Sequence, residues 1–162
     1  MHGLHLTADL HDCRCEMRWL VDAQALGAAC VKAVEAADLR AVGTLFHAFP
    51  AGPRGPGGVT ATVLLAESHL CVHTWPEQCG VTLDVYVCNF GADHSAKAKA
   101  LAGALEALFV PGRVERHALQ RGAIPHGAVA RNHVRPAEGS RPLPQEGARE
   151  GREVTGLGQA VP

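Results

Sequence analysis

The stretch VTATVLLAESHLCVHTW, residues 59–75, decides the fold of this chain. It is rich in β-branched residues, which are enriched in strands. The stretch predicts either one long strand or two strands broken at Glu67-Ser68. The loop before it, PAGPRGPGG at residues 50–58, holds three prolines and four glycines and can sustain neither a helix nor the interior of a strand.

Segments on both sides of this stretch complete a sheet with helices. Residues 3–10 alternate apolar and polar side chains, as a half-buried strand does. Apolar residues recur at steps of three and four in residues 19–38, which predicts a helix. A second helix, capped by Asp93, is predicted over residues 94–109. Further strands are predicted at residues 40–49, 80–88 and 113–120. The expected fold is an α/β (α+β) two-layer sandwich, an antiparallel β-sheet with two helices packed on one face.

The composition is that of a globular chain of single-domain size. Of the 162 residues, 47% are hydrophobic but only 4% are aromatic, so Leu, Val and Ala must make up the core. The formal net charge of −1 and the scattered basic residues indicate no nucleic-acid partner. Residues 126–162 have few large apolar side chains and many Gly, Pro and Arg. We therefore expect one domain at residues 1–122, followed by a disordered tail.

The sequence also predicts a cellular location. No apolar run is long enough to cross a bilayer, and the first residues lack the basic-then-apolar layout of a signal peptide. We expect a cytoplasmic protein with no membrane partner, whose six cysteines form no disulfide framework. Cys13-Arg14-Cys15 lies near histidines, but the spacing is not CxxC and no second pair follows at the right separation. No metal site is predicted.

The densest polar cluster in the sequence is ESHLCVHTWPE, residues 67–77. It lies in a strand-like context, where polar side chains cost free energy unless they are hydrogen-bonded. A cluster of this kind is unusual for packing alone. Part of it is therefore expected to serve a reaction.

This cluster resembles the motif of the prokaryotic S-adenosylmethionine decarboxylases, the self-processing pyruvoyl enzymes of spermidine synthesis. The similarity extends to LDVYVC (83–88), to TLFHAF (44–49) and, more loosely, to GLHLTADLHDC (3–13), and it covers about residues 3–122. The chemistry of the residues agrees, because amino-acid decarboxylation leaves a carbanion that needs an electron sink. No lysine stands near the cluster to hold pyridoxal phosphate, so a carbonyl made from a serine of the chain is the economical alternative.

The resemblance implies that the chain cuts itself. The hydroxyl of Ser68 would attack the carbonyl of Glu67, an N→O acyl shift that forms an ester. β-Elimination would then yield a β chain of residues 1–67 and an α chain of residues 68–162. The α chain would begin with a pyruvoyl group made from Ser68, a covalent cofactor that binds the substrate amine as a Schiff base. His73 would be the base that removes the Cα proton during processing.

The resemblance assigns the remaining site residues as well. Cys88 would donate a proton to the substrate carbon after CO2 leaves. Phe49 would stack on the adenine of S-adenosylmethionine, and Glu77 would hold its ribose hydroxyls. Thr60 stands where the family has a serine that supports the ester step. The family's active site lies at a dimer interface, so a homodimer of processed αβ protomers is implied.

Departures from the family pattern keep a second substrate class open. Thr60 and Ala61 replace an expected serine and glycine, and the loop at residues 50–58 is longer than usual and carries Arg54. The same chemistry could act on ornithine or arginine, in which case the adenine site would be lost. The aromatic and acidic residues assigned to the nucleoside favour S-adenosylmethionine.

The catalytic assignments also have ordinary structural interpretations. Ser68 could be a strand-end serine, His73 a hydrogen-bonded core histidine, and Cys88 a small buried side chain. A chain with such residues would remain uncut and would be a binding or regulatory subunit. The presence of all three at the family spacing favours the enzyme, because such a subunit would have no use for them together.

Overall fold

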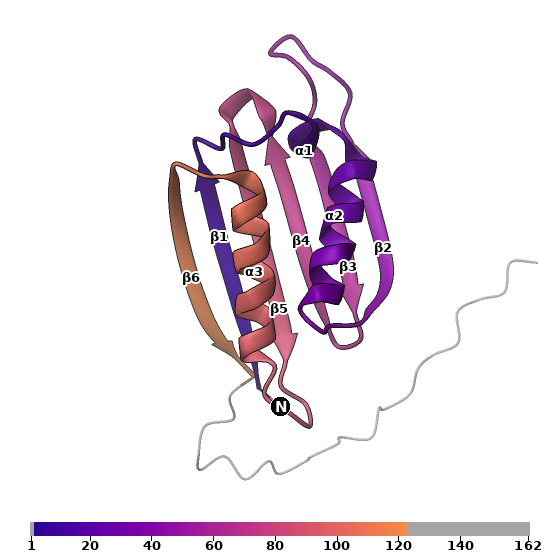
Figure 1. Ribbon diagram of the computed structural model, residues 1–162, viewed down its shortest axis with the longest axis vertical. Coiled ribbons are helices and arrows are strands. Elements are labelled where there is room, and N and C mark those ends of the chain that lie inside the picture. The colour runs from indigo at the N-terminus through magenta and orange to yellow at the C-terminus, as the bar shows by residue number, and fades with distance from the viewer. Residues whose placement is uncertain (1, 123–162) are drawn as a thin grey trace, which may run out of the picture. The chain divides into compact units, whose positions relative to one another are not determined.

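The computed structural model describes residues 2–122, and the predicted tail at residues 126–162 lies outside them. Within residues 2–122 the chain forms one six-stranded sheet in the order β2-β3-β4-β5-β1-β6, with each neighbouring pair antiparallel (Figure 1). The strands are β1 (Gly3–His11), β2 (Ala41–Ala48), β3 (Val59–Leu65), β4 (Ser68–Trp75), β5 (Gly80–Cys88) and β6 (Arg113–Arg121). The helices are α1 (Arg18–Val21), α2 (Ala23–Ala36), α3 (Ser95–Phe109) and a short 3-10 turn, η1 (Pro76–Gln78).

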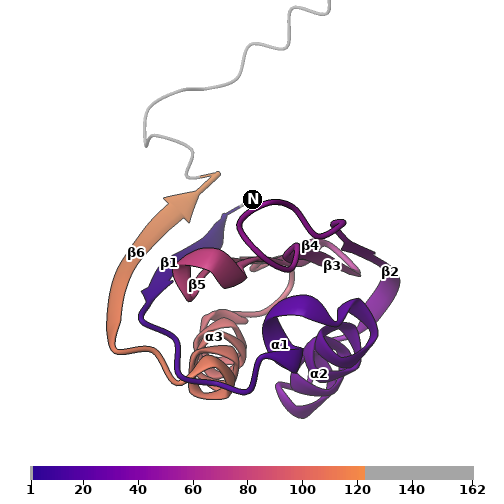
Figure 2. The same ribbon diagram turned by 90° about the horizontal axis from the view of Figure 1, so that it is seen from above.

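The α-helices lie together on one face of the sheet (Figure 2). The apolar side chains of the strands point to that face and form one core with the helices, since two layers are needed to bury the apolar side of each element. The expected two-layer sandwich is confirmed, with the short α1 added to the two predicted helices. The largest fully buried side chains are those of Leu10, Leu20, Leu26, Leu70, Leu83, Leu101, Leu105 and Phe109.

Residues 59–75 form two strands, so the prediction of a break is the correct one. β3 ends at Leu65, Ala66 and Glu67 make the turn, and β4 begins at Ser68, which pairs with Leu65. Alternate residues of β3 are buried under the helices, as the pattern predicts. The Glu67–Ser68 peptide bond therefore lies at the tip of a β-hairpin.

The helix predicted over residues 19–38 is interrupted at Asp22. This residue has extended dihedral angles, φ −102° and ψ 105°, and its Oδ1 accepts hydrogen bonds from the backbone N–H groups of Gln24 (2.9 Å) and Ala25 (3.0 Å). Asp competes in this way for free backbone donors and favours the start of a helix over its interior. A single helix is the wrong prediction, because α1 ends before Asp22 and α2 starts after it.

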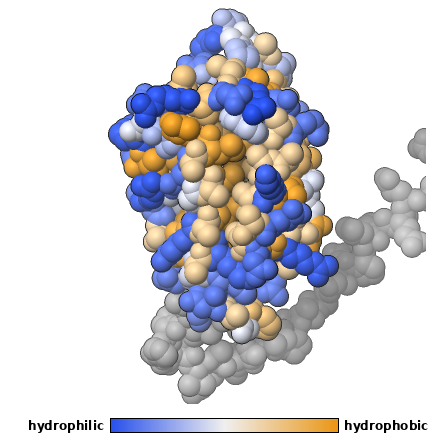
Figure 3. Space-filling model, viewed as in Figure 1, coloured by the Kyte–Doolittle hydropathy of each residue, from blue (hydrophilic) through white to orange (hydrophobic). Residues whose placement is uncertain are grey.

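The other predicted elements are confirmed to within two residues at each end. The helix predicted over residues 94–109 is α3, and Asp93 Oδ1 accepts a hydrogen bond from the N–H of Ser95 at 2.9 Å. On the face that carries the helices, hydrophilic residues surround a central region of apolar residues (Figure 3). Among residues 2–122 no helix is both long and apolar enough to span a membrane.

Candidate active site

The predicted site residues fall into two clusters at opposite ends of β4. Ser68 is the first residue of this strand, and His73 lies five residues further on. Five residues of extended strand span about 16 Å. Within one copy of the chain the structure therefore keeps Ser68 and His73 apart, and each has its own set of neighbours.

The first cluster pairs Ser68 with Cys88. Because β4 and β5 are antiparallel neighbours, the start of one lies beside the end of the other. The backbone N–H of Cys88 donates a hydrogen bond to Ser68 Oγ at 2.9 Å. Ser68 is partly buried, Cys88 is buried, and the preceding Glu67 is exposed in the hairpin turn. The serine hydroxyl and the thiol-bearing residue thus lie together next to the predicted cut.

A cavity opens beside this first cluster. It has a volume of about 310 Å³ and is lined by Glu67, Ser68, Cys88, Phe90, His94 and Lys97, among others. The sequence analysis did not single out Phe90, although this aromatic ring is 70% exposed and follows Cys88 by two residues. An aromatic residue two positions after the end of the strand predicted at residues 80–88 is the sequence signal that could have pointed to it.

The second cluster pairs Thr60 with His73. The two residues are directly opposite one another in the β3–β4 ladder, and Thr60 Oγ1 lies 2.9 Å from His73 Nδ1. This hydrogen bond fixes the orientation of the imidazole ring and leaves Nε2 available. The structure therefore brings together the predicted processing base and the hydroxyl predicted to support processing.

A hollow of about 330 Å³ adjoins the second cluster, lined by Phe49, Val59, Thr60, His73, Thr74 and Trp75. Phe49 and Trp75 are each about half exposed. The ring of His47 meets Phe49 edge-on, with centroids 4.8 Å apart. Trp75 is absent from the residues predicted to bind substrate, yet it stands in the hollow beside Phe49. Its place at the end of the strand that carries His73 is the signal that could have found it.

Close backbone packing positions the loop at residues 50–58 over this end of the sheet. The N–H of Phe49 donates to the carbonyl of Gly58 at 2.9 Å and closes the loop at its base. A Cβ atom at Gly58 would lie 1.9 Å from the carbonyl oxygen of Thr74, so only glycine fits there. Thr74 is itself buried, and its Oγ1 donates to the carbonyl of Leu20 at 2.6 Å and accepts from the N–H of Val59 at 2.7 Å.

Glu77 lies in η1, directly after Trp75-Pro76, and faces the loop. Its side chain is 20% exposed, and its carboxylate lies 3.7 Å from the guanidinium of Arg54, whose side chain is 82% exposed. An exposed ion pair of this length contributes little to stability. The Glu77 carboxylate therefore lies near the aromatic hollow, and its ion pair with Arg54 is easily broken.

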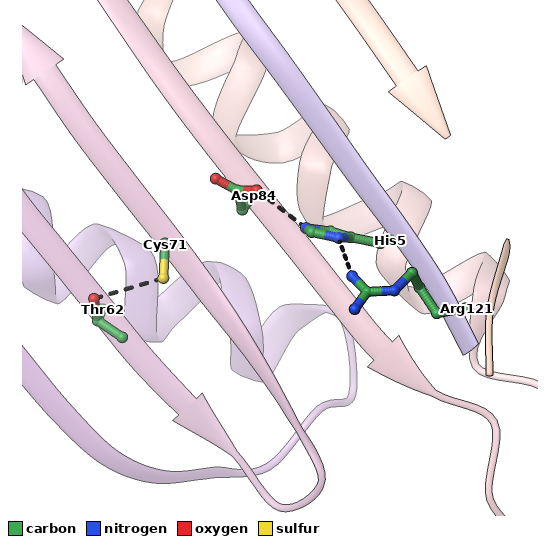
Figure 4. A network of polar contacts seen from close by, with 5 residues as sticks. All are labelled: His5, Thr62, Cys71, Asp84 and Arg121. Atoms are coloured by element: carbon green, nitrogen blue, oxygen red, sulfur yellow. Dashed lines mark hydrogen bonds and ion pairs between the residues drawn. The ribbon is translucent and has the colours of Figure 1, made fainter. Parts of the chain in front are cut away.

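The face of the sheet opposite the helices carries a polar network (Figure 4). His5 Nε2 lies 3.0 Å from Asp84 Oδ1, and the guanidinium of Arg121 lies 3.1 Å from His5 Nδ1. Next to them His69 packs against the rings of His5 and Tyr86. Partial burial, with the nearby charge of His5, lowers the pKa of His69. No helix of the described residues covers this face, and contacts between neighbouring strands hold its polar side chains in position.

Comparison with known proteins connects this geometry to a family. The sequence model described as "S-adenosylmethionine decarboxylase" matches residues 4–122. The chain belongs to the S-adenosylmethionine decarboxylase family. It is 34% identical over 120 residues to a protein of Archaeoglobus fulgidus named "S-adenosylmethionine decarboxylase proenzyme", a match covering 74% of this chain and 97% of that protein. A protein of the same name from Sulfurihydrogenibium sp. is 34% identical over 124 residues, covering 76% and 84%.

A solved structure in the S-adenosylmethionine decarboxylase family has the same fold. The adenosylmethionine decarboxylase of Aquifex aeolicus aligns with a TM-score of 0.65 and 28% identity, over 76% of this chain and 93% of that chain. The expected resemblance to prokaryotic members is confirmed, as is the prediction that the chain belongs to a family of decarboxylases. The individual roles of Ser68, His73 and Cys88 stay predictions.

Proposed function

We propose that this chain is an S-adenosylmethionine decarboxylase that cuts itself between Glu67 and Ser68. It would act in the cytoplasm, release CO2 from S-adenosylmethionine through a pyruvoyl group made from Ser68, and form the aminopropyl donor for spermidine synthesis. One observation carries the proposal: Ser68 Oγ lies at the tip of the β3–β4 hairpin, held at 2.9 Å by the N–H of Cys88.

The position of Ser68 in the hairpin is compatible with its conversion into a pyruvoyl group. The scissile bond lies in an exposed turn, and each of the two strands that it joins has a second neighbour in the sheet, β2 for β3 and β5 for β4. A cut there leaves both strands in place, so residue 68 stays beside Cys88. The carbonyl of the pyruvoyl group would supply the electron sink that decarboxylation requires.

The chain's own groups account for the attack and elimination steps, and water completes the pyruvoyl group. Ser68 Oγ accepts its hydrogen bond from a backbone N–H, so its own proton is free to leave when the oxygen attacks the Glu67 carbonyl. The C–N bond breaks as the ester forms. A base then removes the Ser68 Cα proton, and the Glu67 carboxylate leaves, so residue 68 becomes a dehydroalanine. This tautomerises to an imine, which water hydrolyses to the pyruvoyl group with release of ammonia. His73 would be this base, with Thr60 Oγ1 hydrogen-bonded to its Nδ1.

A second copy of the chain would bridge the separation of about 16 Å along β4. If the open faces of two sheets pack with their strands antiparallel, the Ser68 end of one copy meets the His73 end of the other. The open face offers apolar side chains for such contact, since Leu45, Leu64 and Leu119 are each about half exposed or more. We therefore propose a two-fold homodimer of αβ protomers with two composite sites.

A charge in the middle of the open face should separate the copies. Cys71 lies on this face in the central strand β4, next to Thr62 (Figure 4). Cys71→Arg is expected to give a monomer in sedimentation equilibrium and to slow processing severely. Ala36→Arg, which adds the same charge to the exposed surface of α2, should change neither. A Cys71→Arg monomer that is cut at the normal rate would contradict the composite site.

The second cluster supports a nucleoside substrate. Phe49 and Trp75 border one hollow and present faces on which a purine can stack. Glu77 follows Trp75 by two residues, and its carboxylate can accept hydrogen bonds from two vicinal ribose hydroxyls. In this proposal Cys88, whose backbone N–H bonds to Ser68 Oγ, returns a proton from its thiol to the substrate carbon.

One observation favours ornithine or arginine as the alternative substrate. Glu77 already lies 3.7 Å from a guanidinium, that of Arg54, and so sits where a cationic side chain can approach it. The same carboxylate could receive the side chain of a basic amino acid, with no need for the aromatic hollow. Only the substrate differs between the two proposals, because both use Ser68.

Release of labelled CO2 from S-adenosylmethionine, ornithine and arginine decides between them. We expect release from S-adenosylmethionine alone, abolished by pretreatment with hydroxylamine, which captures carbonyl groups. Glu77→Gln should raise KM for S-adenosylmethionine by about 10- to 100-fold, because a hydrogen bond to a charged group is worth about 1.5–3 kcal/mol. The control Arg54→Ala should change KM by less than about fivefold. Release from a basic amino acid alone would establish the alternative.

A further inference from the structure

Three thiols gather at the end of the sheet where β1 and β4 finish. Cys13 and Cys15 follow β1, and Cys79 follows η1. The backbone N–H of Cys13 donates to the carbonyl of Cys79 at 2.8 Å. All three are free thiols and none belongs to the proposed active site. The fold has thus joined two cysteine-bearing segments that lie far apart in the sequence.

The separation of Cys13 and Cys79 suits a disulfide. A hydrogen bond of 2.8 Å between the amide of one residue and the carbonyl of the other limits their Cα atoms to about 6.7 Å apart. Disulfides span Cα separations of about 4.4–6.8 Å. Cys79 is exposed and accessible to a reagent, whereas Cys13 is 7% exposed and belongs to the core.

We propose that Cys13 and Cys79 are a modification site at which a small-molecule disulfide, such as glutathione disulfide, forms a reversible internal disulfide bond. The Cys79 thiolate attacks one sulfur of the reagent, making a mixed disulfide and releasing one glutathione thiolate. The Cys13 thiolate then attacks Cys79 Sγ and releases the second. Two protein thiols are oxidised, one glutathione disulfide is reduced to two glutathiones, and the two protein protons end on them.

The electrostatics of the cluster set the order and speed of these steps. Burial, followed by the charges of Cys15, Cys79 and Asp12, raises the pKa of Cys13 to about 11. Burial also raises the pKa of Cys15. Few Cys13 thiolates exist at neutral pH, so Cys13 is a slow resolving thiol and not the first to react. Slow closure suits a bond that forms under sustained oxidation and reopens when free glutathione is restored.

The bond has a particular consequence if the chain is cut, and this part rests on the proposed function. Cys13 lies in residues 1–67 and Cys79 in residues 68–162. The disulfide would join the two processing products covalently. It would also tether the segment after β1 to the turn that carries Glu77, because Cys79 ends that turn.

The test uses the full-length protein, incubated for a long period with glutathione disulfide at mildly alkaline pH, or with a phosphine reductant. On a non-reducing gel the oxidised protein should run as one band of full-length size and the reduced protein as two fragments. Cys13→Ser and Cys79→Ser should each give two fragments in both states. Cys15→Ser, the matched control, should behave as the wild type. Circular dichroism checks that each variant is folded.

A processing-independent measurement separates this proposal from the proposed function. In uncut Ser68→Ala protein, oxidation should lower the intact mass by two hydrogen atoms. Trypsin cleaves at Arg14 and so separates Cys13 from Cys15, which lets peptide mapping identify the linked pair. A link that persists in Cys13→Ser, or no link in oxidised Ser68→Ala, would overturn the disulfide. A single band in the reduced wild type would instead contradict self-cleavage.

Discussion

Ser68→Ala protein is expected to run as one full-length band and to release no CO2 from S-adenosylmethionine. Alanine has no hydroxyl to attack the Glu67 carbonyl, so no ester forms and no pyruvoyl group can arise. Wild-type protein should run as two fragments, residues 1–67 and 68–162. Mass spectrometry of the larger fragment should identify a pyruvoyl group at its start.

The matched control for this experiment is Ser95→Ala. The hydroxyl of Ser95 accepts a hydrogen bond from the side chain of Asn89 at 3.2 Å near the start of α3, and Ser95 does not line the cavity beside Ser68. We expect Ser95→Ala to be cut and active. The Ser68→Ala chain should fold, because the substitution removes one hydrogen bond at a partly buried site. Two fragments from folded Ser68→Ala would contradict the assignment, as would a wild-type chain that stays intact after long incubation.

His73→Gln is expected to slow the cut by a factor of about 10²–10⁴, the usual contribution of a positioned general base. Thr60→Val keeps the shape of the threonine but removes the hydroxyl that lies 2.9 Å from His73 Nδ1. Its effect should be smaller, about fivefold, because a single neutral hydrogen bond is worth about 1 kcal/mol. Both rates are measured by densitometry of the fragments over time after rapid purification.

Coexpression of the two blocked variants tests whether His73 acts on its own chain or on a second copy. In a heterodimer of Ser68→Ala and His73→Gln chains, one composite site contains an intact serine and an intact histidine. The His73→Gln chain should then be cut when paired with Ser68→Ala, although it is cut slowly alone. Distinct affinity tags identify which chain yields the fragments. No gain in cutting in the purified heterodimer would show that the site is not shared between copies.

Some features of the fold follow from local pattern and others do not. Alternation along residues 3–10 and the β-branched stretch at 59–75 predicted strands, because one buried face imposes a period of two. The same stretch left open whether the chain breaks at Glu67-Ser68, since periodicity does not specify which segments pair. At Asp22 a local contact interrupted a continuous helical pattern. Its carboxylate accepts hydrogen bonds from two nearby backbone N–H groups, so one helix ends before it and another starts after it.

The sequence by itself predicted the order of strands and helices, because local periodicity suffices for that. Its resemblance to the family singled out the candidate site residues, whose roles stay predictions. Only the tertiary structure decided that Thr60 pairs with His73, that Ser68 lies beside Cys88, and that these two pairs stand at opposite ends of β4. The tertiary structure also brought Cys13 next to Cys79, through a backbone hydrogen bond. These contacts depend on the register and order of strands in the sheet, which long-range packing sets and no local pattern specifies.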